Sequence, residues 1–178
     1  MFDVELIEII AVPYGLMAEQ LNNNIDVKFS WNNFLGFIDD FESYEDFIIS
    51  DIGNYTLYDG DGSATYGFTG IDFPNAYYVG SYIIFNPLKT NPPMDNNAIQ
   101  PHSGEKFIAA FAAQGGPNND WLISQEIPVA SGMKFSFWAK TYMDYGLEKF
   151  RIAVSVTDTE ISSFQFISEV TDAPLDAW

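Results

Sequence analysis

The segment from Asp120 to Lys140 constrains the fold of this chain most strongly. In its second half, side chains of two kinds alternate, as they do in a strand with two different faces. One face would carry Met133, Phe135, Phe137 and Ala139, and the other Lys134, Ser136, Trp138 and Lys140. The first half, 121–127, has the composition of a second short strand that Pro128 ends, followed by a turn at Ser131-Gly132. We therefore expect two aromatic-rich strands joined by a tight corner at the centre of an all-β protein.

Short segments of the same kind recur along the rest of the chain. We expect strands at residues 2–12, 25–31, 77–85, 107–113, 150–156 and 164–170. Turn-forming residues concentrate between them, with four prolines in the polar loop 86–101. No segment has a convincing amphipathic-helix pattern, and short strands separated by turn-rich loops are typical of an antiparallel β-sandwich.

Composition narrows the classes of function. The 178 residues include 25 acidic and seven basic ones, and the formal charge of −18 repels nucleic acid phosphates and anionic lipid surfaces. We therefore expect no nucleic acid partner. The absence of cysteine excludes disulfides and thiol catalysis. No apolar run approaches the roughly 20 residues of a membrane span, so no membrane insertion is expected, and the first residues lack the basic start of a signal peptide.

The tetrapeptide Asp59-Gly60-Asp61-Gly62 is the strongest candidate for a metal site. Its two carboxylates stand two residues apart in a glycine-containing turn, a spacing that lets their oxygens and nearby carbonyls surround one hard cation such as calcium. The alternative is a polar turn in which both aspartates bind their own backbone. Asp39 and Asp40 have the composition of a solvated acidic loop.

Motifs of the common enzyme classes are absent from the sequence. His102 is the single histidine and lies in a turn before a strand, where a surface polar role is expected. There is no Gly-x-Ser-x-Gly elbow, no phosphate loop and no pair of histidines for zinc. The carboxylate pair of a glycosidase cannot be singled out among 25 acids. We expect that the protein is not an enzyme.

Aromatic side chains are the candidates for ligand contact. Most of them are expected in the core, because aromatic residues dominate the interior of β-sandwiches. Trp138, however, is out of phase with its neighbouring phenylalanines, and the loop after its strand carries further aromatic and acidic residues. We expect a ligand surface at Trp138, Tyr142, Asp144 and Tyr145.

Residues 1–36 are set apart from the rest. Val12-Pro13, Gly15-Leu16, the asparagine-rich turn 22–24 and segment 27–31 resemble the opening two strands of a fibronectin type III module. The remaining strands of such a module do not follow. We therefore expect residues 1–36 to be the start of such a module or the end of an upstream domain, and residues 37–178 to form the main domain.

From about residue 37 onward, six landmarks follow one another. They are Phe41-Glu42-Ser43, Asp59-Gly60-Asp61-Gly62, Ser103-Gly104, 119–124, 135–139 and 150–155 followed by Phe164. In this order they resemble the cleaved adhesin domain, also called the choice-of-anchor J domain, known from gingipain adhesin regions and Bacteroidetes surface proteins. The resemblance implies a jelly-roll-like β-sandwich that often binds calcium, and it makes Glu42 a further candidate metal ligand.

The resemblance also implies a role. We expect a non-catalytic adhesin or ligand-binding module of a secreted or cell-surface bacterial protein, stabilised by calcium, with a host or environmental glycan or protein as its partner. The alternatives are a carbohydrate-binding accessory domain of a larger secreted hydrolase or peptidase, and a structural spacer. Members of the family usually continue beyond a residue such as Trp178 with further strands, so we expect a domain truncated at its C-terminus.

Overall fold

The computed structural model describes residues 2–10, 14–21, 26–32, 37–129, 132–142, 146–175 and 178. The strands are β1 (Phe2–Ile10), β2 (Tyr14–Leu21), β3 (Asp26–Asn32), β4 (Ile38–Asp39), β5 (Thr56–Asp59), β6 (Ile83–Phe85), β7 (Phe107–Ala110), β8 (Asp120–Ile123), β9 (Lys134–Thr141), β10 (Lys149–Phe150), β11 (Ala153–Val154), β12 (Gln165–Phe166) and β13 (Thr171–Asp172). The chain also contains the three-residue 3-10 helices η2 (Pro87–Lys89) and η3 (Ile161–Ser163). The predicted all-β class is confirmed. Within these ranges no helix is long and apolar enough to cross a membrane.

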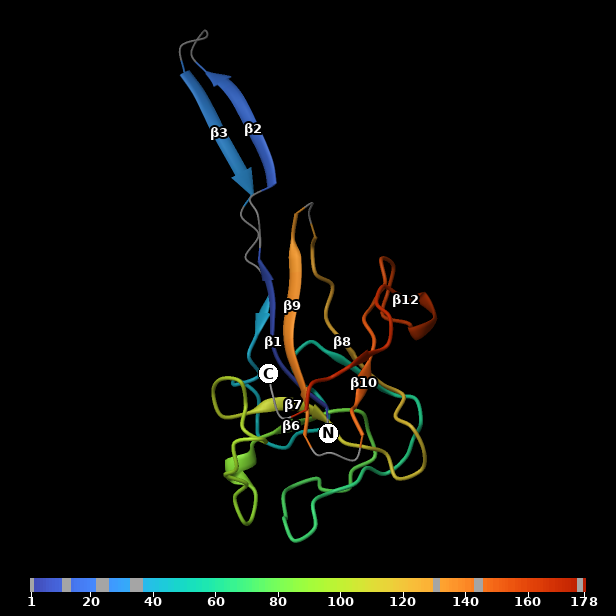
Figure 1. The fold of residues 1–178 in the computed structure, drawn as a ribbon. Helices are drawn as coiled ribbons and strands as arrows, with labels where there is room; N and C mark the ends of the chain where they lie inside the picture. Colours follow the sequence, from blue (N-terminus) through green and yellow to red (C-terminus); the bar gives the residue numbers. More distant parts are fainter. Residues whose placement is uncertain are drawn as a thin grey trace.

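The largest sheet has five strands and is built around β1. β1 pairs antiparallel with β9 along one edge and with β7 and β4 along the other, and β6 extends the sheet beyond β7 (Figure 1). Val4, for example, is the register partner of both Ile108 and Ala139. This sheet crosses the boundary expected at residue 36, because it joins residues 2–10 to strands of segment 37–178. The division into two domains stays a prediction.

β2 and β3 form a separate antiparallel ribbon that projects away from the rest of the molecule (Figure 1). β3 overlaps the expected strand 25–31, in which apolar residues at 25, 27, 29 and 31 alternate with polar residues. In the ribbon, Ala18 is the register partner of Phe29 and Leu21 that of Asp26. The first three strands therefore supply both a strand of the main sheet and this extension.

The expected hairpin between segments 121–127 and 133–140 is wrong. β8 pairs with β5, whereas β9 pairs with β1, and the two strands lie in different sheets. β8 ends at Ile123, and the stretch 124–129 that follows it contains Pro128 and no strand. Proline lacks the amide hydrogen that a ladder requires. The connection is consequently long enough to carry the chain from one sheet to the other.

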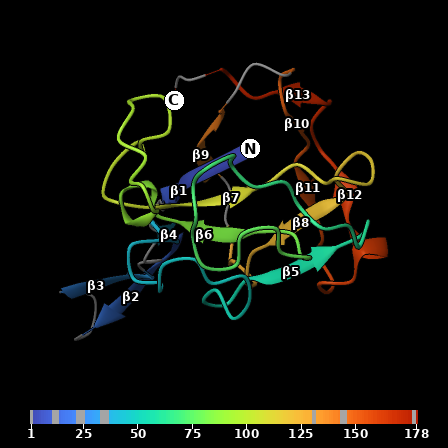
Figure 2. The same cartoon turned by 90° about the horizontal axis from the view of Figure 1, so that it is seen from below.

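Several strands are shorter than their sequence patterns predict. Only residues 83–85 of segment 77–85 form strand, and segment 150–156 is divided between β10 and β11. These two short strands pair with β13 and β12 respectively. Figure 2 shows both pairs on the side of β8, where the rings of Trp121 and Phe166 lie 5.7 Å apart.

The hydrophobic core lies on both faces of β6 and β7. One face belongs to a cluster formed by Phe47, Phe73, Tyr78, Ile83, Phe85, Met94, Ile99, Phe107, Ala109 and Phe111. The other belongs to a cluster formed by Phe41, Ile52, Tyr82, Ile84, Ile108 and Ala110. Because both faces are buried, these strands are continuous apolar runs in the sequence and do not alternate with polar residues.

Lys140 departs from the pattern predicted for β9. Its side chain is fully buried, and its Nζ donates a hydrogen bond to the carbonyl oxygen of Gln100 (2.6 Å). The ammonium group also lies 4.3 Å from the centroid of the Trp178 ring, and the Trp178 indole donates to the same carbonyl (3.1 Å). A buried charge requires such partners. The end of β9 is thereby tied to residue 100 and to Trp178.

We predict that Phe85→Ala lowers the free energy of unfolding by about 3–5 kcal/mol. Phe85 is fully buried, and its ring lies 5.2–5.7 Å from those of Phe47, Phe73 and Phe107. Truncation therefore removes apolar contacts and leaves a cavity, which urea unfolding followed by tryptophan fluorescence would measure. Leu88→Ala, at a side chain that is 48% exposed, is the control and should change stability by less than about 0.5 kcal/mol. A loss as small as that of the control would contradict the core assignment.

Candidate functional site

Asp59 and Asp120 face each other at the end of the β5–β8 pair. They are register partners, since β5 ends at Asp59 and β8 begins at Asp120. Directly opposed residues in an antiparallel pair have Cβ atoms about 4.5–5.5 Å apart. Asp61 follows in the turn after β5, and one carboxylate oxygen from each of the three lies within 4.8 Å of the other two. The structure thus brings the predicted pair Asp59 and Asp61 together with a third acid.

The turn after β5 is held by its own carboxylates. Oδ1 of Asp59 accepts hydrogen bonds from the backbone N–H groups of Asp61 (3.1 Å) and Gly62 (2.7 Å). Oδ1 of Asp61 accepts from the N–H of Ser63 (3.0 Å), and Oδ2 accepts from that of Asn119 (2.9 Å). The bond from Asn119 is the main cause that lowers the pKa of Asp61. The polar turn considered from the sequence is therefore present, and Oδ2 of Asp59, which accepts neither of these two bonds, is left for a cation.

Gly60 lets this turn approach the residues that precede β8. Its N–H donates to the carbonyl of Asn119 (2.9 Å), and a Cβ at residue 60 would lie 2.3 Å from Nδ2 of the same asparagine. Contacts this short are not tolerated, so a side chain at position 60 would push the turn away from β8. The glycine is required here for close approach.

Asp120 is the least satisfied of the three acids. Its Oδ2 accepts a hydrogen bond from Nδ2 of Asn118 (2.7 Å), whereas its Oδ1 is buried without a hydrogen-bond partner. The pKa of Asp120 is raised to about 7: burial is the largest cause, the bond from Asn118 acts in the opposite direction, and the negative charges of Asp61 and Asp59 add to the rise. An unpaired buried carboxylate oxygen is costly, and a cation at this position would give it a partner.

The three carboxylates could together hold a metal ion. Oxygen ligands of this kind suit hard cations, and calcium in particular accepts six to eight oxygens in flexible geometry. Sequence reasoning missed Asp120, because only the register of β5 against β8 places it opposite Asp59. A signal was available in Asn118-Asn119-Asp120, a run of polar side chains immediately before an apolar strand.

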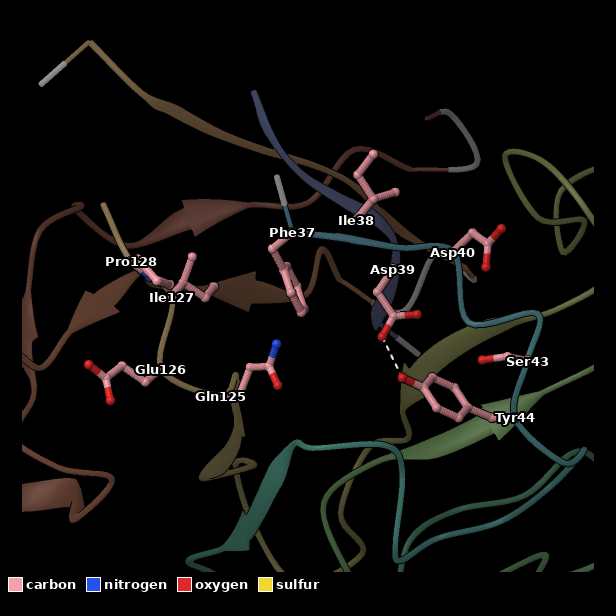
Figure 3. A pocket seen from close by; sticks show the side chains of 10 residues that line it. All are labelled: Phe37, Ile38, Asp39, Asp40, Ser43, Tyr44, Gln125, Glu126, Ile127 and Pro128. Atoms are coloured by element: carbon pink, nitrogen blue, oxygen red, sulfur yellow. Dashed lines mark hydrogen bonds between the residues drawn. The ribbon is translucent and has the colours of Figure 1, made fainter. Parts of the chain in front are cut away.

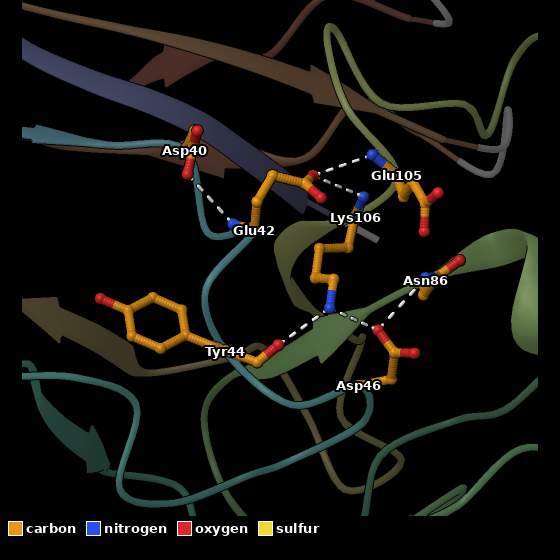
Figure 4. A network of polar contacts seen from close by, with 7 residues as sticks. All are labelled: Asp40, Glu42, Tyr44, Asp46, Asn86, Glu105 and Lys106. Atoms are coloured by element: carbon orange, nitrogen blue, oxygen red, sulfur yellow. Dashed lines mark hydrogen bonds and ion pairs between the residues drawn. The ribbon is translucent and has the colours of Figure 1, made fainter.

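Glu42 lies outside this cluster. Its Oε1 accepts hydrogen bonds from the backbone N–H groups of Glu105 (2.8 Å) and Lys106 (3.0 Å), as Figure 4 shows. The Glu42 carboxylate lies directly against Gly104, which has a φ of +70°. A Cβ at residue 104 would lie 2.2 Å from Oε1 of Glu42. In this structure Glu42 connects the segment after β4 to the residues that enter β7. Its role as a metal ligand stays a prediction of the family resemblance.

Lys106 extends the same network. Its Nζ donates to the carbonyl of Tyr44 (2.8 Å) and forms an ion pair with Asp46 (2.8 Å), which also accepts a hydrogen bond from Asn86 (3.2 Å) (Figure 4). The Lys106 side chain is only 12% exposed. Segment 40–46 is therefore fastened to the beginning of β7 and the end of β6 by polar contacts.

The expected ligand surface is only partly described. Trp138 is 42% exposed and stacks on His102, with ring centroids 4.3 Å apart. Tyr142 packs edge-on against Phe68 of the core (5.8 Å), and its hydroxyl accepts a hydrogen bond from Asn96 (3.3 Å). Asp144 and Tyr145 lie outside the described residues. Of the two described residues, Trp138 is the more exposed to solvent.

Comparison with known proteins adds no relative. No family model matches the chain. Searches of the curated proteins and of the solved structures also find no significant match. The resemblance to the cleaved adhesin domain therefore rests on the sequence landmarks alone.

We predict that the metal-free protein loses stability as pH rises from about 4 to 7, through ionisation of Asp120. Its pKa in the folded state is about 7, above the ordinary 3.8, so the folded protein binds more protons than the unfolded chain within this window. The stabilisation from protonated Asp120 is fully present below pH about 4, and it is lost as the pH rises through the folded-state pKa of Asp120. Urea unfolding in chelator at a series of pH values would measure it.

The matched control for this pH dependence is Asp120→Asn, which keeps the shape and cannot ionise. Titration of the acids that are distant from residue 120 is common to both proteins. Their difference in unfolding free energy should therefore change across the window. A difference that stays constant from pH about 4 to 8 would contradict the raised pKa of Asp120.

A second prediction separates the two possible roles of Glu42. Glu42→Gln should lower the free energy of unfolding by about 1–3 kcal/mol, because two backbone N–H groups lose a charged acceptor. Thermal unfolding with and without calcium would show an equal loss in both conditions if Glu42 only binds the backbone. A calcium response smaller than that of the Glu105→Gln control would instead make Glu42 a ligand.

Proposed function

We propose that this chain is a non-catalytic, adhesin-like ligand-binding module of a secreted or cell-surface bacterial protein, with a jelly-roll-like β-sandwich and a structural calcium ion. The observation that carries the calcium site is the buried, unpartnered Oδ1 of Asp120 beside the carboxylates of Asp59 and Asp61. The three carboxylates, at the end of β5, in the turn after it and at the start of β8, repel one another when ionised, and a cation between them would relieve this repulsion.

The chemistry of the donors supports calcium over transition metals. All three candidate ligands are carboxylates, whereas zinc and copper favour the sulfur of cysteine and the nitrogen of histidine. The chain has no cysteine and a single histidine, and that histidine stacks on Trp138. Magnesium demands near-ideal octahedral geometry, whereas calcium accepts flexible geometry. The carboxylates of this turn already bind backbone N–H groups and have little freedom to adjust, so calcium fits the site more readily.

A cation at this place would act on the fold. It would join the end of β5 to the beginning of β8, and through the Asn119 contacts it would fix the loop between β7 and β8. An ion present at 100 times its dissociation constant stabilises the folded state by about 2.7 kcal/mol. The non-catalytic part of the proposal rests on the sequence, in which the common catalytic motifs are absent.

The test is thermal unfolding in millimolar calcium and in excess chelator, at fixed pH and ionic strength. We expect calcium to raise the midpoint by about 5–10 °C, which is what about 2.7 kcal/mol produces in a domain of this size. The double variant Asp59→Asn, Asp61→Asn should lose this shift, since it keeps acceptors for the turn but removes two charges.

The matched control is Asp95→Asn, which removes a charge at an exposed position elsewhere. It should keep the full calcium response. Equal midpoints with calcium and with chelator in the unmodified protein would exclude the calcium site. A shift that survives in the double variant would place the ion elsewhere.

A further inference from the structure

A cavity of about 440 Å³ lies between the segment around β4 and the stretch that follows β8. Figure 3 shows its lining: Phe37, Asp39 and Tyr44 come from one side, and Gln125 from the other, with Asp40 and Glu126 at opposite ends. The cavity is separate from the Asp59–Asp61–Asp120 cluster, since none of those three aspartates lines it.

Asp39 and Tyr44 form the polar centre of this cavity. The Tyr44 hydroxyl donates to Oδ2 of Asp39 (2.6 Å), and the N–H of Phe41 donates to Oδ1 (2.9 Å). Burial, together with the hydrogen bond and charge of Asp39, raises the pKa of Tyr44, so the phenol keeps its proton. The phenolic oxygen consequently faces the cavity only as an acceptor.

The polar lining is rich in acceptors and poor in donors. It contains the three carboxylates of Asp39, Asp40 and Glu126, and among the described lining residues there is no lysine, arginine or histidine. The side-chain oxygen of Gln125 accepts a hydrogen bond from Asn54 (2.8 Å). The NH₂ group of Gln125 is therefore one of the few hydrogen-bond donors in the lining. A ligand that satisfies this lining must therefore bring hydrogen-bond donors, and preferably positive charge.

The remaining lining distinguishes an organic cation from a metal ion. Within the described part of the chain, only Asp59, Asp61 and Asp120 bring acidic or histidine ligand atoms within 4.8 Å of one another in a group of three. The carboxylates of this cavity are more widely spread. Phe37, Ile127 and Pro128 supply apolar surface beside them, which suits a hydrocarbon body, and an aromatic ring attracts cations.

We propose that this cavity binds a small organic cation, a primary ammonium or guanidinium group on a short hydrocarbon body. The charged group contacts Asp39 and the Phe37 ring, and the hydrocarbon lies against Ile127 and Pro128. The excess of acids over bases in the whole chain draws such a cation from solution. The cation is either a free amine or the side chain of lysine or arginine in a partner protein.

The experiment is a titration followed by the amide NMR signals of Tyr44 and Gln125, at low salt and in chelator. The probes are n-butylammonium and its neutral isostere 1-butanol. We expect saturable shifts with the ammonium ion and affinity at least about tenfold weaker for the alcohol, because only a charged donor gains from the carboxylates. The absence of saturable shifts with butylammonium, or equal affinity for butanol, would overturn the proposal.

Variants identify the residues responsible. Asp39→Asn should weaken butylammonium binding at least about tenfold, with the thermal midpoint confirming that it folds. Phe37→Leu keeps the apolar volume, leaves the Asp39 contacts intact and removes the aromatic face, so it tests the site if Asp39→Asn is unstable. Glu169→Gln removes one exposed charge elsewhere and is the control. Binding that is equal in Phe37→Leu and the control would contradict the proposed placement of the cation.

A further arm separates the sources of the cation. A blocked Gly-Arg-Gly peptide is compared with free methylguanidinium. Tighter binding of the peptide would assign the cavity to a protein side chain, and tighter binding of the free ion would assign it to a small molecule. The titration is independent of the calcium proposal, because chelator is present throughout and the midpoint shift with calcium does not enter it.

Discussion

Burial of β6 and β7 on both faces is the constraint on which the rest of the structure depends. Ile83 and Phe85 point into one cluster while Ile84 points into the other, and β7 repeats the pattern with Phe107 and Ile108. Two strands alone cannot cover themselves in this way. Their two faces are covered by side chains from outside the strands, among them Phe47 and Phe73 on one face and Phe41 on the other, which explains why so much of the chain without regular structure carries aromatic residues.

Negative charge shapes what remains at the surface of this core. The acid-rich composition leaves few basic residues to compensate, and Lys106 and Lys140 are both committed to carbonyl contacts inside the fold. Several carboxylates therefore accept hydrogen bonds from backbone N–H groups, as Glu42 and Asp59 do. Where such donors run out, as at Asp120, the protein holds a carboxylate whose pKa is raised. The candidate metal site lies where one acid, Asp120, keeps a buried oxygen without a hydrogen-bond partner.

The sequence predicted the local features well and the pairing of strands poorly. Alternation found β3 and much of β9, and Asp59-Gly60-Asp61-Gly62 was correctly a turn with converging carboxylates. Proximity in sequence suggested that β8 and β9 pair, which is wrong: β8 pairs with β5, and β9 pairs with β1. Strand pairing depends on which faces the strands bury, and not on their distance along the chain. Asp120 could not be predicted as a metal ligand, because the pairing of β8 with β5 was not predictable from the sequence. Its place opposite Asp59 is a matter of register, which neither segment encodes alone.

The central place of β1 has a consequence for synthesis of the protein. Val4 is synthesised long before its register partner Ala139 in β9, so the main sheet cannot be completed until β9 has emerged from the ribosome. At about 5–20 residues per second, the apolar N-terminal strand spends seconds without its neighbours. Pairing between such distant segments is also intrinsically slow. The molecule therefore passes through a period in which a β-rich segment with an open edge is exposed, and an unpaired edge of this kind is prone to aggregation.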